Sequence, residues 1–248
     1  MSEDVDFKVV LRDAAPASAN QLRKELGRLR DRMTAGLQAA GFDIDPANTA
    51  QVKSRDANRY TVYHLTAGPT DSQPAPLRAS LLIELNYTQL RLPTVRLPVA
   101  SFITEAFARP AEIAGIDCAS ITETAAEKFV SLTRRTAMEM AGLSRVPDPS
   151  LVRHIYDLHQ VREHIEHAEL AALARTIAAQ DAQEFAHQHP AYQHNIVAET
   201  HKAVAFLNND PAVAARYDSF VAAMVYGDQS LFRDAMATVS AMAARVWP

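Results

Sequence analysis

The pattern of hydrophobic and polar positions changes partway along the chain. Residues 4–12 alternate imperfectly and are rich in β-branched side chains, which predicts a strand with one buried face. Two further apolar runs, at 60–65 and 79–87, predict strands separated by a stretch of Gly, Pro, Asp and Ser. From Ser120 onward, glycine and proline become rare and apolar residues recur at helical spacing to the C-terminus.

A long helix is predicted between the first and second strands. Ser18 can cap its N-terminus with the side-chain oxygen. Gly41 can end it, because glycine readily adopts the left-handed conformation found where many helices stop. The apolar side chains between these two residues fall on one helix face: Leu22, Leu26, Leu29, Met33 and Leu37.

The helices of the second half have local boundary signals. Ser120 and Glu123 have the spacing of a capping box. Asp148 and Asp210 each precede a proline, which suits an N-cap followed by the first helical residue. Pro190 is expected to break the helix that runs up from about His167. Gly227 is expected to separate two further helices.

These patterns predict two domains, an α+β domain at 1–119 and an all-helical bundle at 120–248. With 248 residues and 48% apolar composition, the chain can bury a normal core. A net charge of −4 gives no indication of a nucleic-acid binder, although a local basic patch stays open. A polar N-terminus and the lack of an apolar run of about eighteen residues predict a cytoplasmic protein with no membrane partner. The single cysteine, Cys118, excludes an intramolecular disulfide and a cysteine-based zinc cage.

The most informative polar residues lie in the first predicted strand. Asp4 and Asp6 are two residues apart, so in a strand both carboxylates point to the same face and can share divalent cations. Glu84 lies inside an apolar run, where a carboxylate is costly unless it is paired or binds a ligand. The three residues together are candidate ligands for the paired Mg²⁺ ions of nucleotidyl transfer. On spacing alone, a solvated strand end is the favoured interpretation of Asp-x-Asp.

Two predicted helices of the second half carry further charged residues at helical spacing. Lys128 and Arg135 share one helix face, which can either meet a triphosphate or form a solvated basic surface. Arg153 and Asp157 are one turn apart and can form an ordinary ion pair within a helix.

Three segments resemble the AbiEii/AbiGii family of bacterial abortive-infection toxins. Residues 2–8, Ser-Glu-Asp-Val-Asp-Phe-Lys, resemble the family segment that contains the nucleotidyltransferase carboxylates. Residues 126–135 are similar to the family's Glu-Lys helix with trailing arginines. Residues 153–158 resemble its last motif, usually Arg-Asp-x-x-Asp-Leu, with His154 in place of the first aspartate. The three segments occur in the family's order.

This resemblance implies a function and a set of site residues. The implied fold is a small nucleotidyltransferase-like mixed sheet with helices, followed by a helical bundle. The implied activity is transfer of a nucleoside monophosphate from an NTP to an acceptor, with Mg²⁺ or Mn²⁺ as cofactor. The implied acceptor is RNA, with tRNA as the acceptor in characterised relatives, and the implied partner is a cognate antitoxin. The implied catalytic residues are Asp4, Asp6, Lys128 and Asp157, and the implied nucleotide-binding residues are Ser2, Lys128, Arg135 and Arg153.

One departure from the superfamily pattern concerns the phosphate-binding turn. Related nucleotidyltransferases have a Gly-Gly or Gly-Ser turn shortly before the paired aspartates, where free N–H groups hold the phosphates. The first glycine of this sequence is Gly27, which follows Asp6. We therefore expect either a truncated start or a weakened nucleotide site with slow turnover. The alternative function is an impaired relative that acts as an interaction protein.

Two other features have ordinary explanations. The nine histidines lack a His-x-x-x-His pair beside a suitable carboxylate, so scattered surface histidines are the better interpretation. The basic residues at 23–32 can contact an RNA backbone, but Glu25 and Asp31 interrupt them, and a solvated helix face explains them as well.

Overall fold

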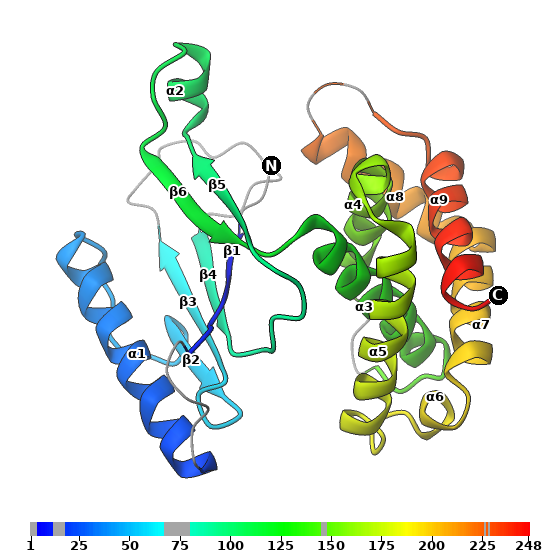
Figure 1. Ribbon diagram of the computed structural model, residues 1–248, viewed down its shortest axis with the longest axis horizontal. Coiled ribbons are helices and arrows are strands. Elements are labelled where there is room, and N and C mark those ends of the chain that lie inside the picture. Colours follow the sequence, from blue (N-terminus) through cyan, green and yellow to red (C-terminus); the bar gives the residue numbers. More distant parts are fainter. Residues whose placement is uncertain (1–3, 12–17, 67–79, 145–147, 226, 228) are drawn as a thin grey trace. The chain divides into compact units, whose positions relative to one another are not determined.

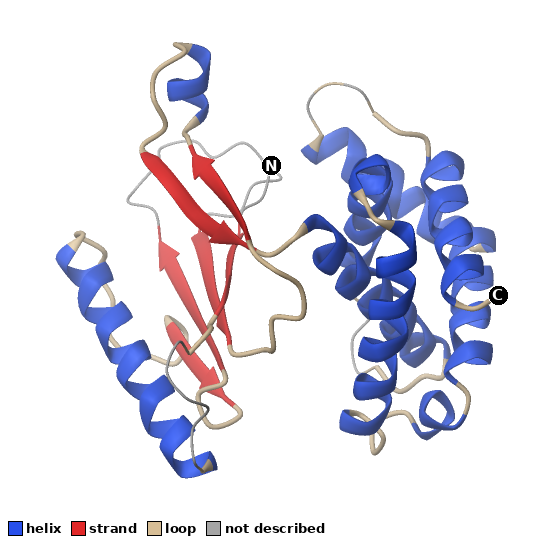
Figure 2. Ribbon diagram, in the orientation of Figure 1, coloured by secondary structure: helices blue, strands red, loops and turns tan. Residues whose placement is uncertain are grey.

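The computed structural model describes residues 4–11, 18–66, 80–144, 148–225, 227 and 229–248, with backbone only for Asp4 and Ser80. Contacts divide the chain into two compact units, Met1–Arg91 and Leu92–Pro248. A mixed sheet with one long helix occupies the first unit, and helices dominate the second (Figures 1 and 2). The predicted α+β fold class with C-terminal helices is confirmed. The domain boundary predicted after residue 119 stays a prediction.

The first unit contains a four-stranded sheet in the order β1-β4-β3-β2. The strand β1 is parallel to β4, whereas the other neighbouring strands are antiparallel. The predicted strands at 60–65 and 79–87 correspond closely to β3 and β4, whereas β2 is a short strand that the apolar pattern does not indicate. The bounds are Asp4–Lys8 for β1, Val52–Arg55 for β2, Tyr60–Thr66 for β3, Ser80–Asn86 for β4 and Ala19–Ala39 for α1.

Helix α1 and the sheet enclose the core of the first unit. Ser18 caps α1 by accepting a hydrogen bond from the Gln21 N–H, and Gly41, at a φ of +94°, follows the helix end. The Tyr63 hydroxyl donates to the Arg30 carbonyl oxygen at 2.8 Å, which ties α1 to β3. The core side chains are Ile44, Val52, Tyr63, Leu65, Ile83 and Leu85, with Phe7, Val9, Met33 and Leu37 packed against them.

The second unit begins with a two-stranded antiparallel ribbon and continues as a helical bundle. The ribbon comprises β5 (Val95–Val99) and β6 (Ile113–Cys118), joined through the short helix α2 (Phe102–Ala106). The bundle comprises α3 (Ile121–Met140), α4 (Val152–Val161), α5 (His167–Glu184), α6 (Pro190–His194), α7 (Ile196–Asn209), α8 (Pro211–Met224) and α9 (Phe232–Val246). The 3₁₀ turns η1 (Pro149–Leu151) and η2 (Arg162–His164) flank α4.

The bundle core lies around α3, α4, α5 and α9, where large apolar side chains are almost fully buried. It includes Phe129, Leu132, Ile155, Leu158, Leu170, Tyr217, Met236, Val239 and Met242. Burying a side chain of this size is worth roughly 1.5–3 kcal/mol, so these residues set how α3 and α4 face each other. None of the described helices is long and apolar enough to cross a membrane.

Most of the predicted helix boundaries depend on short-range hydrogen bonds. Ser120 accepts from the Glu123 N–H at the start of α3, and Asp210 accepts from the Ala212 N–H at the start of α8. The Glu123 carboxylate is fully buried and accepts a 2.8 Å bond from the Leu92 N–H, so it also anchors the chain ahead of β5. Pro190 does not break a helix as predicted. Helix α5 ends earlier, at Glu184, and Pro190 is the first residue of α6.

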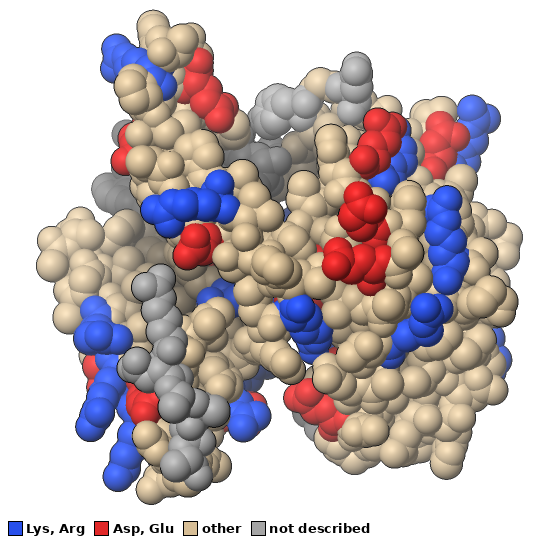
Figure 3. All heavy atoms as spheres, in the orientation of Figure 1, with Lys and Arg blue, Asp and Glu red and all other residues tan. Residues whose placement is uncertain are grey.

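Charged side chains are distributed over the surface of both units. On the face drawn in Figure 3, basic and acidic residues are interspersed, and neither sign forms a continuous patch. This mixture agrees with the small net charge of −4.

Candidate functional site

The acidic residues of the first unit meet where β1 pairs with β4. The parallel register places Asp6 opposite Glu84. Directly paired residues of neighbouring strands point to the same sheet face, so these two carboxylates are neighbours. Asp4 pairs through its backbone with Leu82, two residues earlier in the same strand, and its side chain lies outside the described part of the chain. Ser2 also lies outside it.

The Asp6–Glu84 pair lies on the face of the sheet opposite the core. Ile83 and Leu85 flank Glu84, and both are buried in the core that α1 covers. Since side chains alternate along a strand, Glu84 must point the other way. It is half-buried there, and Asp6 is exposed. Alternate residues of the apolar run around Glu84 therefore pack in the core. The Glu84 carboxylate lies on the other face of the sheet.

Tyr60 adds a third polar group to this face. Its phenol is half-buried and hydrogen-bonds Glu84. Burial raises the pKa of Tyr60, and the bond to Glu84, the charge of Glu84 and that of Asp6 raise it further, although Arg55 acts in the opposite direction. The Arg55 guanidinium lies 4.1 Å from the centre of the Tyr60 ring. Tyr60 therefore stays a neutral hydrogen-bond donor that orients the Glu84 carboxylate.

The donor set on this face fits a hard divalent cation. Carboxylate oxygens are the ligands that Mg²⁺ and Mn²⁺ prefer in proteins. Among the residues whose side chains are described, no group of three or more His, Cys, Asp or Glu is arranged to hold a metal ion. The two described carboxylates, Asp6 and Glu84, supply oxygen ligands of the right type in neighbouring positions.

A second charged group lies between α3 and α4 in the second unit. The Lys128 Nζ of α3 donates to the Asp157 Oδ2 of α4 at 2.5 Å. Their side chains are 32% and 37% exposed, so the pair is accessible to a ligand while its surroundings are partly dry. The residues that follow them, Phe129 and Leu158, are buried in the bundle core. Packing of these apolar neighbours brings the lysine and the aspartate together across the two helices.

His154 lies one turn before Asp157 on α4. Its Nδ1 is buried and has no hydrogen-bond partner among the described residues. Burial lowers the pKa of His154 to about 4, and the positive charges of Lys128 and Arg135 act in the same direction, partly offset by Asp157 and Asp148. His154 is therefore a neutral imidazole near pH 7 and adds no charge to the Lys128–Asp157 pair.

Arg135 supports the start of α4. Its guanidinium forms an ion pair with Asp148. The Asp148 carboxylate also accepts from the Ser150 N–H and hydroxyl, at 2.8 and 2.6 Å. The Asp148 N–H donates to the Glu139 carboxylate at 2.8 Å. Burial acts to raise the pKa of Asp148, but the hydrogen bonds from Ser150 and the charge of Arg135 outweigh it and lower the pKa. Arg135 and Glu139 of α3 thus hold Asp148, and with it the segment that leads into α4.

Arg153 and Asp157, which the sequence suggests as an ion pair one helical turn apart, have different partners in the structure. Asp157 is paired with Lys128. Arg153 instead lies with its guanidinium 5.7 Å from the centre of the Phe220 ring of α8. The face shared by Lys128 and Arg135 is directed at the carboxylates of the 148–157 segment, and both side chains stay partly exposed.

The sequence does not indicate the contacts that two residues of these groups make. Tyr60 stands at the start of an apolar run and looks like a core aromatic, because only strand pairing brings it near Glu84. Asp148 is recognisable as a helix cap from the proline after it, but its pairing with Arg135 has no local signal.

One comparison with known proteins gives a match. The family model described as "Nucleotidyl transferase AbiEii toxin, Type IV TA system" matches residues 1–239. No curated protein and no solved structure matches the chain.

Proposed function

The chain belongs to the AbiEii family of nucleotidyl transferase toxins of type IV toxin–antitoxin systems, and on that premise we propose that it transfers a nucleoside monophosphate from an NTP to an RNA acceptor. In this proposal Asp4, Asp6 and Glu84 hold Mg²⁺ or Mn²⁺, and Lys128 and Asp157 bind and orient the nucleotide. The observation that carries the proposal is the register that pairs Asp6 with Glu84 across the parallel strands β1 and β4.

The carboxylate face supports metal-dependent phosphoryl chemistry. A divalent cation bound between Asp6 and Glu84 would offset the repulsion between their like charges. A bound divalent cation would lower the pKa of the attacking hydroxyl and neutralise charge on the triphosphate. Tyr60 donates to Glu84 and keeps that carboxylate oriented before a ligand arrives.

The Lys128–Asp157 pair supports nucleotide binding. The Lys128 ammonium is a compact charge with three donors, which suits a phosphate oxygen. The Asp157 bond takes one donor direction and restrains the lysine side chain, so the remaining directions are available to a triphosphate. Neutral His154 preserves the positive potential at this position, since it neither adds nor removes charge. Arg153 is a further candidate for the nucleotide, whereas Arg135 supports the site through Asp148.

The finer parts of the proposal concern the acceptor and the partner. We propose tRNA as the acceptor, because the family resemblance implies RNA and a 3′ hydroxyl can accept a nucleoside monophosphate. A cognate antitoxin follows from the type IV family. The reaction would take place in the cytoplasm, where NTPs and tRNA are present.

A second candidate function is a binding protein that retains the fold with little catalysis. The observation that favours it is His154, which stands where the family's last motif usually has an aspartate.

An NMP-transfer assay tests the proposal and separates the two candidates. The chain is incubated with Mg²⁺, total RNA and each NTP labelled at the α-phosphate. We expect label on RNA, and its loss in Asp6→Asn and Glu84→Gln. Asp31→Asn, which removes an exposed carboxylate on α1, is the matched control and should label normally. Absence of labelling would reject the transferase proposal in favour of the binding protein.

A further inference from the structure

The two-stranded ribbon of the second unit is exposed on both faces. Every residue of β5 is exposed, and the residues of β6 are exposed or half-buried. None of the ribbon's side chains belongs to the hydrophobic clusters that the described residues form. An isolated two-stranded hairpin is marginally stable at best in water. A surface that packs against the ribbon would therefore stabilise it.

The strand register gathers the apolar side chains of the ribbon on one face. Arg96 pairs with Asp117 on the other face, where their side chains form a 3.4 Å ion pair. Since paired residues point to the same side of a sheet, the apolar face carries no charge. It consists of three pairs across the ribbon: Val95 with Cys118, Leu97 with Ile116, and Val99 with Ile113.

Helix α2, which joins the end of β5 to the start of β6, adds three large apolar side chains (Figure 1). Phe102, Ile103 and Phe107 are 69%, 66% and 67% exposed. At 3.6 residues per turn they fall within about 140° of the helix circumference, so they point to one side of α2. Phe102 follows Val99, the last residue of β5, by three positions, so the two apolar surfaces adjoin. We call them together the ribbon patch.

Polar contacts, rather than apolar packing, hold α2 in place. The Glu112 carboxylate accepts hydrogen bonds from the Ser101 hydroxyl at 2.6 Å, the Ser101 N–H at 2.9 Å and the Thr104 hydroxyl at 2.5 Å. These bonds lower the pKa of Glu112 to about 2, so it stays charged near pH 7. Thr104 is buried and faces inward. The apolar side chains of α2 are therefore available to another molecule.

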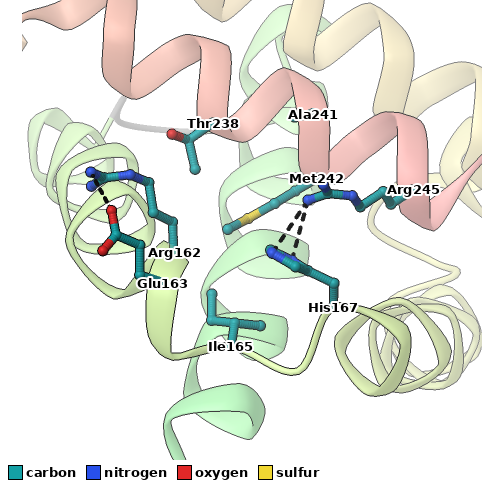
Figure 4. Close-up of a pocket in the computed structure, with 8 residues that line it drawn as sticks. All are labelled: Arg162, Glu163, Ile165, His167, Thr238, Ala241, Met242 and Arg245. Carbon is teal, nitrogen blue, oxygen red and sulfur yellow. Dashed lines mark hydrogen bonds and ion pairs between the residues drawn. The ribbon is translucent and has the colours of Figure 1, made fainter.

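The helical bundle of the same unit covers its apolar side chains much more completely. Figure 4 shows a pocket between η2, α5 and α9, and even there Ile165 and Met242 are only 6% and 1% exposed. By contrast, seven large apolar residues between positions 95 and 113 are at least 44% exposed. Contiguous exposed apolar patches of more than a few hundred Å² are typical of interaction sites.

The charges around the ribbon patch favour a second copy of this chain as its partner. Residues 95–118 include two basic and three acidic residues, a net charge of −1, which gives no attraction to an anionic membrane or to RNA. Glu105 and Arg109 are exposed, and neither has an ion-pair partner among the residues that the structure describes. A two-fold axis perpendicular to α2 would run the helices of two copies antiparallel, so that Arg109 of each copy could meet Glu105 of the other.

The area of the ribbon patch agrees with that of a stable dimer. Its seven exposed residues present on the order of 800 Å² of surface, because fully exposed side chains of this size have roughly 150–250 Å² each and these are 44–69% exposed. A standard protein interface buries about 800 Å² on each partner. Aromatic residues and arginine, present here as Phe102, Phe107 and Arg109, are enriched in such interfaces.

We propose that the ribbon patch is a self-association surface through which two copies of this chain form a symmetric dimer, with Arg109 of each copy paired with Glu105 of the other. The inference does not depend on nucleotidyl transfer, so either proposal can fail without the other.

Sedimentation velocity of the full chain tests the dimer from about 0.1 to 100 μM, because interfaces of this size reach micromolar affinity or tighter. We expect Phe102→Ser and Phe107→Ser each to raise the dimer Kd about tenfold or more, since buried aromatic residues contribute most to interface energies. The matched control is Leu231→Ser, which removes a 57% exposed apolar side chain at the start of α9 and should change Kd by less than about twofold.

Charge reversal tests the symmetric pairing itself. Arg109→Glu makes one variant acidic at both positions, and Glu105→Arg makes the other basic at both, so each should self-associate at least about tenfold more weakly. An equal mixture of the two variants should form a heterodimer with about the wild-type Kd, because both pairs form again with their charges exchanged. Repair within one chain cannot produce this result, since each variant carries like charges.

The remaining outcomes identify a different cover for the ribbon patch. A wild-type chain that stays monomeric would overturn the proposal, as would equal Kd values for Phe107→Ser and Leu231→Ser, or a mixture of charge variants that does not associate. In a monomer, a lower melting temperature of Phe107→Ser would assign the cover to the chain itself, and cosedimentation with phosphatidylcholine vesicles would assign it to a membrane. Thermal melts identify variants that fail to fold, and the mixing experiment does not depend on the phenylalanine variants.

Discussion

At the scale of single residues, the role of the carboxylates on β1 and β4 depends on their neighbours across the sheet. Asp6 and Glu84 lie side by side through strand register, and Tyr60 donates to Glu84 from the same face. Neighbouring carboxylates supply oxygen ligands of the kind that divalent cations prefer. Metal affinity is therefore the direct measure of this group.

We expect Asp6→Asn to weaken Mn²⁺ binding about tenfold or more, because one charged oxygen ligand is replaced by a neutral amide, and even outer partners of metal ligands affect affinity by 10–100-fold. Glu84→Gln should behave alike. Titration calorimetry measures the change, with Asp31→Asn as the exposed control on α1. The same Mn²⁺ affinity in wild type and both site variants would show that these carboxylates do not hold the metal.

His154 gives the molecule a specific dependence on pH. Its pKa is about 4 in the folded chain, below the ordinary value of 6.5. The unfolded state therefore takes up the proton first, so the stability from neutral His154 is complete above about pH 6.5 and falls as pH drops toward about 4. Charges from Lys128, Arg135, Asp148 and Asp157 surround this histidine.

We expect His154→Leu to lose less stability than wild type on going from pH 7.5 to pH 5, by on the order of 2 kcal/mol. Urea unfolding at each pH gives the free energies. His189, whose pKa burial also lowers, titrates in both proteins, so its contribution cancels in the difference. Parallel pH profiles for the two proteins would show that His154 does not titrate as its burial requires.

At the scale of elements, the start of α4 depends on a contact from α3. Asp148 accepts the Ser150 N–H as a local cap and also pairs with Arg135. Asp210 precedes Pro211 at the start of α8 and makes only a local cap in this comparison, by accepting a hydrogen bond from the Ala212 N–H. The two Asp-Pro sequences are alike locally and differ in their partners from other elements.

This difference predicts unequal effects of the same substitution. Asp210→Ala removes one cap and should cost about 1 kcal/mol. Asp148→Ala removes the cap and leaves the Arg135 guanidinium without its carboxylate, so we expect about 2–3 kcal/mol. Urea unfolding with unchanged m values is the measurement. Equal losses for the two variants would mean that the Arg135–Asp148 pair adds no stability beyond the cap.

At the scale of the whole molecule, the two charged groups belong to different compact units. The carboxylates of Asp6 and Glu84 lie in the unit ending at Arg91, and the Lys128–Asp157 pair lies in the unit beginning at Leu92. A nucleotidyl transfer reaction requires both a metal site and a phosphate site. In the proposed function the carboxylates bind the metal ion, and the Lys128–Asp157 pair binds phosphate.

We therefore expect substitutions in the two units to separate metal binding from nucleotide binding. Lys128→Gln should weaken NTP affinity about tenfold, the usual consequence of losing a charged hydrogen bond worth roughly 1.5–3 kcal/mol. Its Mn²⁺ affinity without nucleotide should match wild type. Calorimetry with each ligand tests both statements. Lys202→Gln, which removes a lysine paired with Glu199 on α7, is the control. A loss of Mn²⁺ affinity in Lys128→Gln would contradict the division of roles.

The sequence by itself determined the features that depend on neighbouring residues. The caps at Ser18, Ser120, Asp148 and Asp210 form as predicted, because the hydrogen bonds that make them join residues two or three apart. The strands at 60–66 and 80–86 and the long first helix follow from periodicity. Resemblance in three ordered motifs identified the family.

Only the tertiary structure decided which distant residues meet. Asp6 faces Glu84 because β1 and β4 pair in parallel in one register, and a shift by one residue would turn Glu84 to the other face. Lys128 meets Asp157, rather than leaving it to Arg153, because the apolar faces of α3 and α4 pack in one orientation. Local sequence preferences do not determine such contacts. They depend on which side chains, far apart in the chain, are buried together.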